Sequence, residues 1–78
     1  MAHCDADELD RKLLAAHARA DNAALVQFYT QAGDMAESQG QIEATCFYLT
    51  HAYVLALEQG NPSVDHLRKR LVAYGREK

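Results

Sequence analysis

The chain has 78 residues, of which 49% are hydrophobic and 24% are charged, so we expect one globular domain spanning residues 1–78 rather than a disordered segment. Its formal net charge of −3 argues against nucleic acid as a partner. The most apolar stretch, residues 44–57, is too short to cross a bilayer core of about 30 Å, so no membrane partner is expected.

The first predicted helix spans about residues 6–20. Asp5 is a suitable N-cap, and Glu8 follows it at the spacing of a capping box. Leucine and alanine then recur at helical spacing along one side. This stripe consists of Leu9, Leu13, Ala16 and Ala20. Its small alanines predict that a second helix approaches closely.

The second predicted helix spans about residues 23–39 and ends at Gly40, which suits the left-handed position after a helix. Gly33 predicts tight packing of a neighbouring helix, because a glycine within a helix costs about 1 kcal/mol relative to alanine. The apolar face consists of Leu25, Phe28, Tyr29, Ala32 and Ala36. The third predicted helix, about residues 41–59, follows so closely that it must form an antiparallel helical hairpin with the second.

Within the third helix, residues 44–57 are the segment around which we expect the other helices to pack. One side carries Ile42, Thr45, Cys46, Leu49, Ala52, Tyr53 and Ala56. The opposite side is polar at both ends and carries Phe47, Thr50, His51 and Val54 between them. We expect the first or fourth helix to cover Phe47 and Val54, or else another molecule, in which case this stripe is a candidate seam for self-association.

The fourth predicted helix spans about residues 62–74. Asn61 precedes Pro62, which suits the first position of a helix because its φ is fixed and its missing N–H is not needed there. The apolar stripe consists of Val64, Leu67, Leu71 and Tyr74. Basic side chains occupy much of the remaining surface, which is either a solvated face or a contact for an acidic protein.

Small residues recur at Gly33, Gly40 and Ala52, with Tyr29 and Leu49 as large residues between and before them. This pattern, over about residues 26–57, resembles the tetratricopeptide repeat, which has small residues at its eighth, fifteenth and twenty-seventh positions. The resemblance implies a four-helix array and a binding module rather than an enzyme. The implied groove would present Gln27, Thr30, Asp34, Glu37, Asp65, Arg68 and Lys69.

The histidines and cysteines do not form a recognisable chemical motif. No C-x-x-C or H-E-x-x-H spacing occurs, and Cys46 and His51 fall on different faces of their predicted helix. Cys46 falls on the core side, where a thiol is inert. We therefore expect no metal site, no cofactor and no catalytic residue.

These observations predict a small, non-catalytic protein–protein interaction or adaptor module. Its partner is another protein, acidic if it meets the basic helix, or a second copy of the chain. The alternative is a homodimeric structural or regulatory helical protein, and an enzyme subunit or a small nucleic-acid-binding regulator ranks third. The reduced thiols and the absence of an apolar leader predict a bacterial-type cytoplasm.

Overall fold

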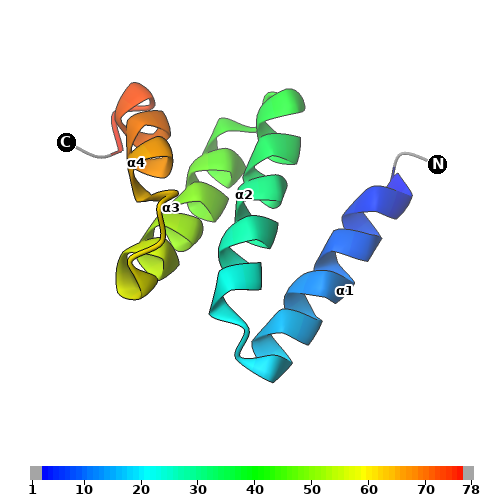
Figure 1. The fold of residues 1–78 in the computed structure, drawn as a ribbon. Coiled ribbons are helices and arrows are strands. Elements are labelled where there is room, and N and C mark those ends of the chain that lie inside the picture. The colour runs from blue at the N-terminus through cyan, green and yellow to red at the C-terminus, as the bar shows by residue number, and fades with distance from the viewer. Residues whose placement is uncertain (1–2, 77–78) are drawn as a thin grey trace.

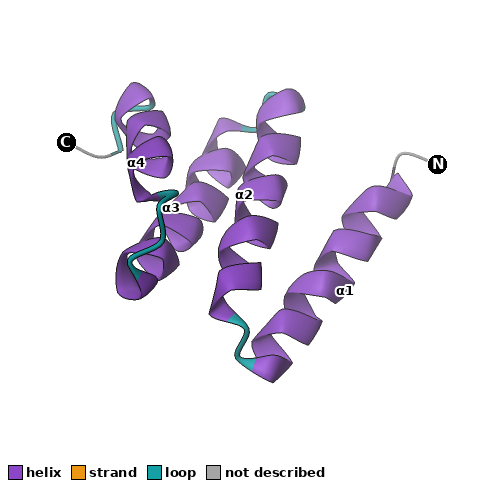
Figure 2. Ribbon diagram, viewed as in Figure 1, coloured by secondary structure: helices purple, strands orange, loops and turns teal. Residues whose placement is uncertain are grey.

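Four α-helices account for almost all of the described chain. The computed structural model describes residues 3–76, with side chains from residue 8 onward. The helices are α1 (His3–Arg19), α2 (Asn22–Ser38), α3 (Ile42–Gln59) and α4 (Val64–Ala73), and residues 3–76 contain no strand (Figure 2). The predicted all-α class with four helices is therefore confirmed.

The helices form an open array rather than a closed bundle. Figure 1 shows them in the order α4, α3, α2 and α1, and each packs on its neighbour in the sequence. The packing between α2 and α3 is the most extensive, and among the described helices the backbone of α1 approaches only α2. The Cα atoms occupy a slab of 36 × 30 × 15 Å. Parts of each helix therefore face solvent instead of another helix.

The core lies between α2, α3 and α4. It consists of Val26, Leu49, Ala52, Ala56, Leu67 and Leu71, each at most 3% exposed. Val26 lies outside the predicted apolar face of α2, because α2 has two neighbours and buries a separate side against each of them. Gly33 explains the close fit of α2 on α3, since a Cβ at this position would lie 2.9 Å from Leu49 Cδ2. The tight packing predicted at Gly33 is confirmed.

The helix boundaries follow the local signals with two exceptions. Helix α1 begins at His3, so Asp5 lies within the helix and the predicted N-cap is wrong. The helix can start before Asp5 because no glycine or proline lies between His3 and Asp5. Helix α4 begins at Val64 rather than at Pro62. The side-chain oxygen of Asn61 accepts the Ser63 N–H at 2.8 Å and closes a turn around Pro62 before the helix starts.

Helices α1 and α2 are both followed by a residue in the left-handed conformation, but only α2 has a glycine at that position. Gly40 follows α2 with φ of 72°, as predicted for the left-handed position. Ala20 follows α1 in the same left-handed conformation, with φ of 54°, although its Cβ is unfavourable there. The chain then enters α2 through Asp21, whose carboxylate accepts the Ala24 N–H at 3.2 Å. Asp21 is therefore the N-cap of α2.

The expectation that three helices enclose residues 44–57 is wrong. Helices α2 and α4 cover one side of α3, while α1 lies on the far side of α2 (Figure 1). Leu14 of α1 is 70% exposed, and Ala20 is also exposed. The outward side of α3 is consequently left without a covering helix in the described chain.

Candidate interaction surface on α3

Seven residues, spaced so that they fall along one side of the helix, form the uncovered side of α3. We call this stripe the exposed α3 face, and it consists of Glu43, Phe47, Thr50, His51, Val54, Leu57 and Glu58. Three of its members are large and apolar: Phe47 is 57% exposed, Val54 47% and Leu57 52%. The opposite side of the same helix carries Leu49 and Ala52, which are fully buried. The segregation follows from the helical repeat of 3.6 residues.

The structure brings all four predicted seam residues onto this one face. Phe47, Thr50, His51 and Val54 are all exposed, so the alternative in which α1 or α4 covers Phe47 is wrong, while cover by another molecule stays a prediction. Leu57 extends the face, but the sequence pattern did not assign it there. In a segment that is apolar on almost every side, helical periodicity does not show on which side the last residues lie. The surface is therefore larger and more apolar than the sequence indicated.

Aromatic and imidazole rings fix the position of Phe47. The ring of His51 lies 4.5 Å from that of Phe47, and His51 Nδ1 lies 3.0 Å from the Phe47 carbonyl oxygen. On its other side His51 stacks on Tyr29 of α2, with ring centroids 5.1 Å apart. The Tyr29 hydroxyl lies 2.9 Å from Nε2 of His17 in α1. Side chains from three helices thus support one exposed ring, and no motif in the sequence identifies His17 as part of it.

A hollow of about 310 Å³ lies beside Val54 on this surface. Its walls come from α1, α2 and α3, and it is lined by His17, Tyr29, Thr50, His51, Val54, Leu55 and Glu58. The stacked rings of Tyr29 and His51 close one side. An exposed apolar knob at Phe47 and a recess next to Val54 therefore occur on the same face of one helix.

A second hollow lies between Phe47 and Arg76, near the C-terminus of the chain. It is lined by Glu43, Cys46, Phe47, Thr50, His51 and Arg76. Nη2 of Arg76 donates a hydrogen bond to Glu43 Oε2 at 2.7 Å, and this bond raises the pKa of Arg76. The carboxylate at the N-terminal end of the exposed α3 face is consequently paired, whereas Glu58 stands at the other end.

Two of the residues predicted to line a groove, Asp34 and Glu37, are engaged in internal contacts between α2 and α4. Arg70 of α4 donates from Nη1 to Asp34 Oδ1 at 2.6 Å and from Nη2 to Glu37 Oε1 at 3.1 Å. The Tyr74 hydroxyl also donates to Glu37, which raises the pKa of Tyr74. The Arg70 side chain is only 17% exposed. We call these four residues, Asp34, Glu37, Arg70 and Tyr74, the α2–α4 clamp.

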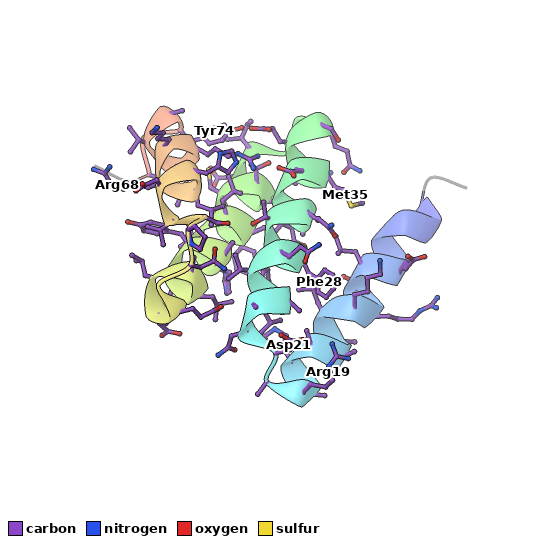
Figure 3. All side chains as sticks on the ribbon, in the orientation of Figure 1. Arg19, Asp21, Phe28, Met35, Arg68 and Tyr74 are labelled. Atoms are coloured by element: carbon purple, nitrogen blue, oxygen red, sulfur yellow. The ribbon has the colours of Figure 1, made fainter. Side chains whose placement is uncertain are left out.

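The other predicted groove residues do not join the α2–α4 clamp. Gln27 and Thr30 line a shallow hollow next to Asn61, and the Thr30 hydroxyl donates to the Val26 carbonyl at 2.7 Å. Asp65, Arg68 and Lys69 are exposed on α4. Arg68 precedes Arg70 by two residues, or roughly 200° around the axis, and points away from α2 (Figure 3). The seven residues are therefore spread over more than one surface, and their role in binding stays a prediction.

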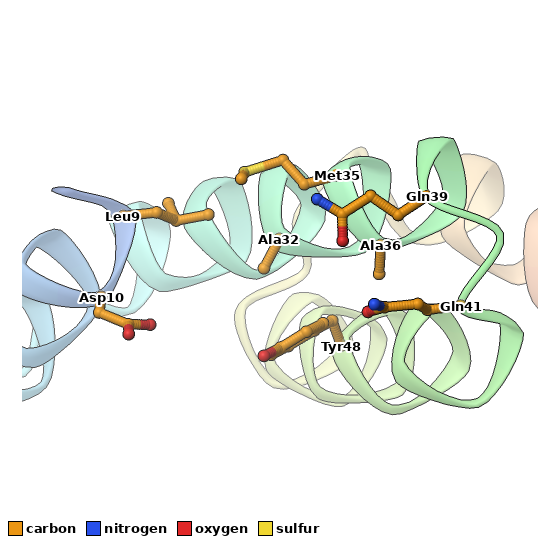
Figure 4. A pocket seen from close by; sticks show the side chains of 8 residues that line it. All are labelled: Leu9, Asp10, Ala32, Met35, Ala36, Gln39, Gln41 and Tyr48. Carbon is orange, nitrogen blue, oxygen red and sulfur yellow. The ribbon is translucent and has the colours of Figure 1, made fainter. Parts of the chain in front are cut away.

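A further hollow lies where α1 diverges from the other helices. Figure 4 shows Leu9 and Asp10 of α1 facing Ala32, Met35 and Ala36 of α2, with Gln39, Gln41 and Tyr48 completing the lining. Its volume is about 200 Å³, and the floor is formed by the small Ala32 and Ala36 side chains. The lining mixes apolar side chains with a carboxylate, two amides and a phenol, and this mixture does not define a ligand.

Residues 3–76 thus form an open, all-α array with an exposed apolar face on α3. No family model, curated protein or solved structure matches the chain. Among residues 3–76 no helix is both long enough and apolar enough to span a membrane. The same part of the chain contains no cluster of three or more His, Cys, Asp or Glu side chains suited to a metal ion. Its function has to be inferred from the surface geometry.

Proposed function

We propose that the chain is a non-catalytic protein-interaction module that binds a partner helix across the exposed α3 face. The observation that carries this proposal is the exposure of Phe47, Val54 and Leu57 by about half each on one uncovered helix side. Contiguous exposed apolar surface of this kind marks interaction sites in proteins. An amphipathic helix laid along α3 is the occupant that matches a long, narrow apolar stripe.

The tetratricopeptide-like arrangement is part of the same proposal. In stacked helical repeats each hairpin buries its apolar side against the next unit. Here α3 packs on α2 and α4, and within residues 3–76 no helix covers its remaining side. The close contact of Gly33 with Leu49 supports a repeat-like packing of α2 on α3. A partner helix would take the place that a further repeat takes in a longer array.

The two predicted surfaces differ in what they can still bind. In the α2–α4 clamp, Asp34 and Glu37 already hold Arg70, so a basic partner would have to compete with an internal ion pair. Binding there would gain little, because one ion pair to these two carboxylates would only be exchanged for another. The apolar members of the exposed α3 face have no such internal competitor.

The size of the apolar stripe sets the expected affinity. Burying the exposed halves of three large apolar side chains contributes on the order of 3 kcal/mol. Association costs at least about 4 kcal/mol in lost translational and rotational freedom. The partner must therefore also engage the hollow beside Val54. We expect a transient contact at the small end of the range of protein interfaces, with a dissociation constant on the order of 100 µM.

Site-specific photo-crosslinking tests this function. A photoreactive phenylalanine analogue replaces Phe47 in cells of the native host, and a matched variant carries it at Val72, which is 42% exposed on α4. We expect a protein adduct from position 47 and none from position 72. The adduct's second component, purified and mixed with the chain, should bind and should lose binding to Val54→Lys. Equal adducts from both positions, or none from position 47, would contradict the proposal.

A further inference from the structure

The exposed α3 face has a symmetry that points to its partner. Resting on the proposed function, we infer that the helix bound by this face is α3 of a second copy, running antiparallel about a two-fold axis between Thr50 and His51. The chain would then be a reversible homodimer. The evidence comes from the order of the side chains along α3 and from the adjoining hollow, and the charge of Arg76 is compatible with this pairing.

Six of the seven residues of the face are arranged symmetrically around its centre, and Leu57 is the exception. Phe47 lies three residues before Thr50, and Val54 lies three residues after His51. Glu43 and Glu58 stand seven residues from the same two positions. An antiparallel pairing about this centre places Phe47 against Val54 of the second copy, and the same contact recurs on the other side of the axis. Such a surface is self-complementary, as a two-fold interface requires.

The hollow beside Val54 gives the Phe47 ring a place to bind. A ring positioned over Val54 of the second copy reaches the mouth of the recess that His17, Tyr29 and Leu55 also line. Large aromatic anchors in such recesses contribute most of the energy of protein interfaces. The dimer would contain two of these contacts, which meets the requirement that the partner engage the hollow.

Charge is compatible with the antiparallel pairing. That arrangement brings Glu43 of one copy towards Glu58 of the other, and two carboxylates alone would repel each other. Arg76 lies 2.7 Å from Glu43, so a guanidinium is already present at this edge of the face. It can bridge both carboxylates, because an arginine offers several donors in one plane. A parallel pairing would instead place each Phe47 against its own equivalent and leave the hollows empty.

Sedimentation equilibrium of the purified full chain from 1 µM to 1 mM tests the inference. We expect reversible monomer–dimer exchange for the wild type. Phe47→Lys should weaken dimerisation at least tenfold, whereas Val72→Lys, which adds the same charge to an exposed site on α4, should leave it unchanged. Because both sites are exposed, both variants should retain helical circular dichroism. A dimer equally stable in Phe47→Lys would overturn the inference.

A crosslinking experiment tests the direction of pairing. Glu43→Cys and Glu58→Cys are made in a Cys4→Ser background, where the remaining Cys46 is buried. When the two variants are mixed with a short bis-maleimide, we expect mainly the mixed 43–58 product. Predominant 43–43 and 58–58 products would overturn the antiparallel arrangement.

The inference and the proposed function fail in distinguishable ways. A wild-type chain that stays monomeric at 1 mM, together with a photo-adduct of a different protein at position 47, would overturn the second-copy partner and keep the interaction module. A monomer without any adduct at position 47 would overturn both. A dimer that depends on Phe47 and gives the 43–58 product supports both.

Discussion

The α2–α4 clamp and the exposed α3 face show opposite uses of their side chains. In the clamp, Asp34, Glu37 and Arg70 are charged residues that contact each other and hold two helices together. On the exposed α3 face, Phe47 and Val54 are apolar residues with about half of their surface in solvent. Residue type alone would assign the two roles the other way round.

The difference follows from the open array. A helix with neighbours on only two sides must leave another side in solvent, whatever residues that side carries. Helices α2 and α4 have no close backbone contact, so long charged side chains span the space between them. Helix α3 has no neighbour over Phe47, so an apolar side chain remains exposed. This geometry therefore predicts that the charged side chains make contacts within the chain and that the exposed apolar side chains make contacts with another molecule.

The largest expected effect is a difference in stability between substitutions on the two sides of α3. Leu49→Ala should lower the free energy of unfolding by about 2–5 kcal/mol, because Leu49 is fully buried. Phe47→Ala should change it by less than about 0.5 kcal/mol at low micromolar concentration, where the chain is monomeric. Urea denaturation measures both. If Phe47→Ala cost about 3–5 kcal/mol, the ring would be covered within the chain and the comparison would fail.

The next largest expected effect is the loss of stability when the α2–α4 clamp is broken. Arg70→Ala should destabilise the fold by about 1–2 kcal/mol, since it removes two charge-assisted hydrogen bonds whose acceptors are partly exposed. Part of this loss should disappear in 1 M NaCl because of screening. Dimerisation should not change, whereas Phe47→Lys should affect dimerisation and not stability. Loss of dimerisation in Arg70→Ala would show that the two regions are not independent.

A smaller effect is expected at the junction of α1 and α2, which positions His17 at the hollow. Ala20→Gly should stabilise the fold by about 0.5–1 kcal/mol, because glycine adopts the left-handed conformation of this residue without strain. The control Ala18→Gly lies within α1 and should destabilise by about the same amount. Thermal unfolding of both variants checks the signs. Destabilisation by Ala20→Gly would contradict the account of this junction.

The smallest effect concerns pH. Because the hydrogen bond to Glu37 raises the pKa of Tyr74 above its ordinary value of 10.0, the bond stabilises the fold below pH 10.0. This contribution is lost as the pH rises through the raised pKa. The stability of the wild type should therefore fall more steeply above pH 10.0 than that of Tyr74→Phe. Denaturation midpoints that fall in parallel would show that the hydroxyl contributes nothing to the clamp.

Local sequence patterns were sufficient for the elements and for part of the site. Helical spacing identified four helices, Gly33 and Gly40 marked a close contact and a helix end, and Phe47 and Val54 were assigned to one stripe. The sequence signals for these features lie within one or two helical turns, although the contact at Gly33 is with Leu49 of the next helix. The chain therefore encodes them in short segments.

The placement of α1 and the role of Arg70 could not be predicted in the same way. The stripe through Leu9 and Ala16 shows that α1 buries one side but does not say against which helix. Arg70 looked like one of several solvated basic residues, because its partners Asp34 and Glu37 are more than thirty positions away. Both features depend on long-range packing, which periodicity does not contain.

The most direct test of the central claim uses the two phenylalanines of the chain, Phe28 and Phe47, as matched probes. With fluorinated phenylalanine, a soluble paramagnetic agent should broaden the Phe47 signal strongly at 10 µM, while the half-buried Phe28 is affected less. At 1 mM the Phe47 signal should become protected as the exposed α3 face is covered, and Phe28 should not change. A Phe47 signal protected as well as that of Phe28 at 10 µM would contradict the open face on which the proposed function depends.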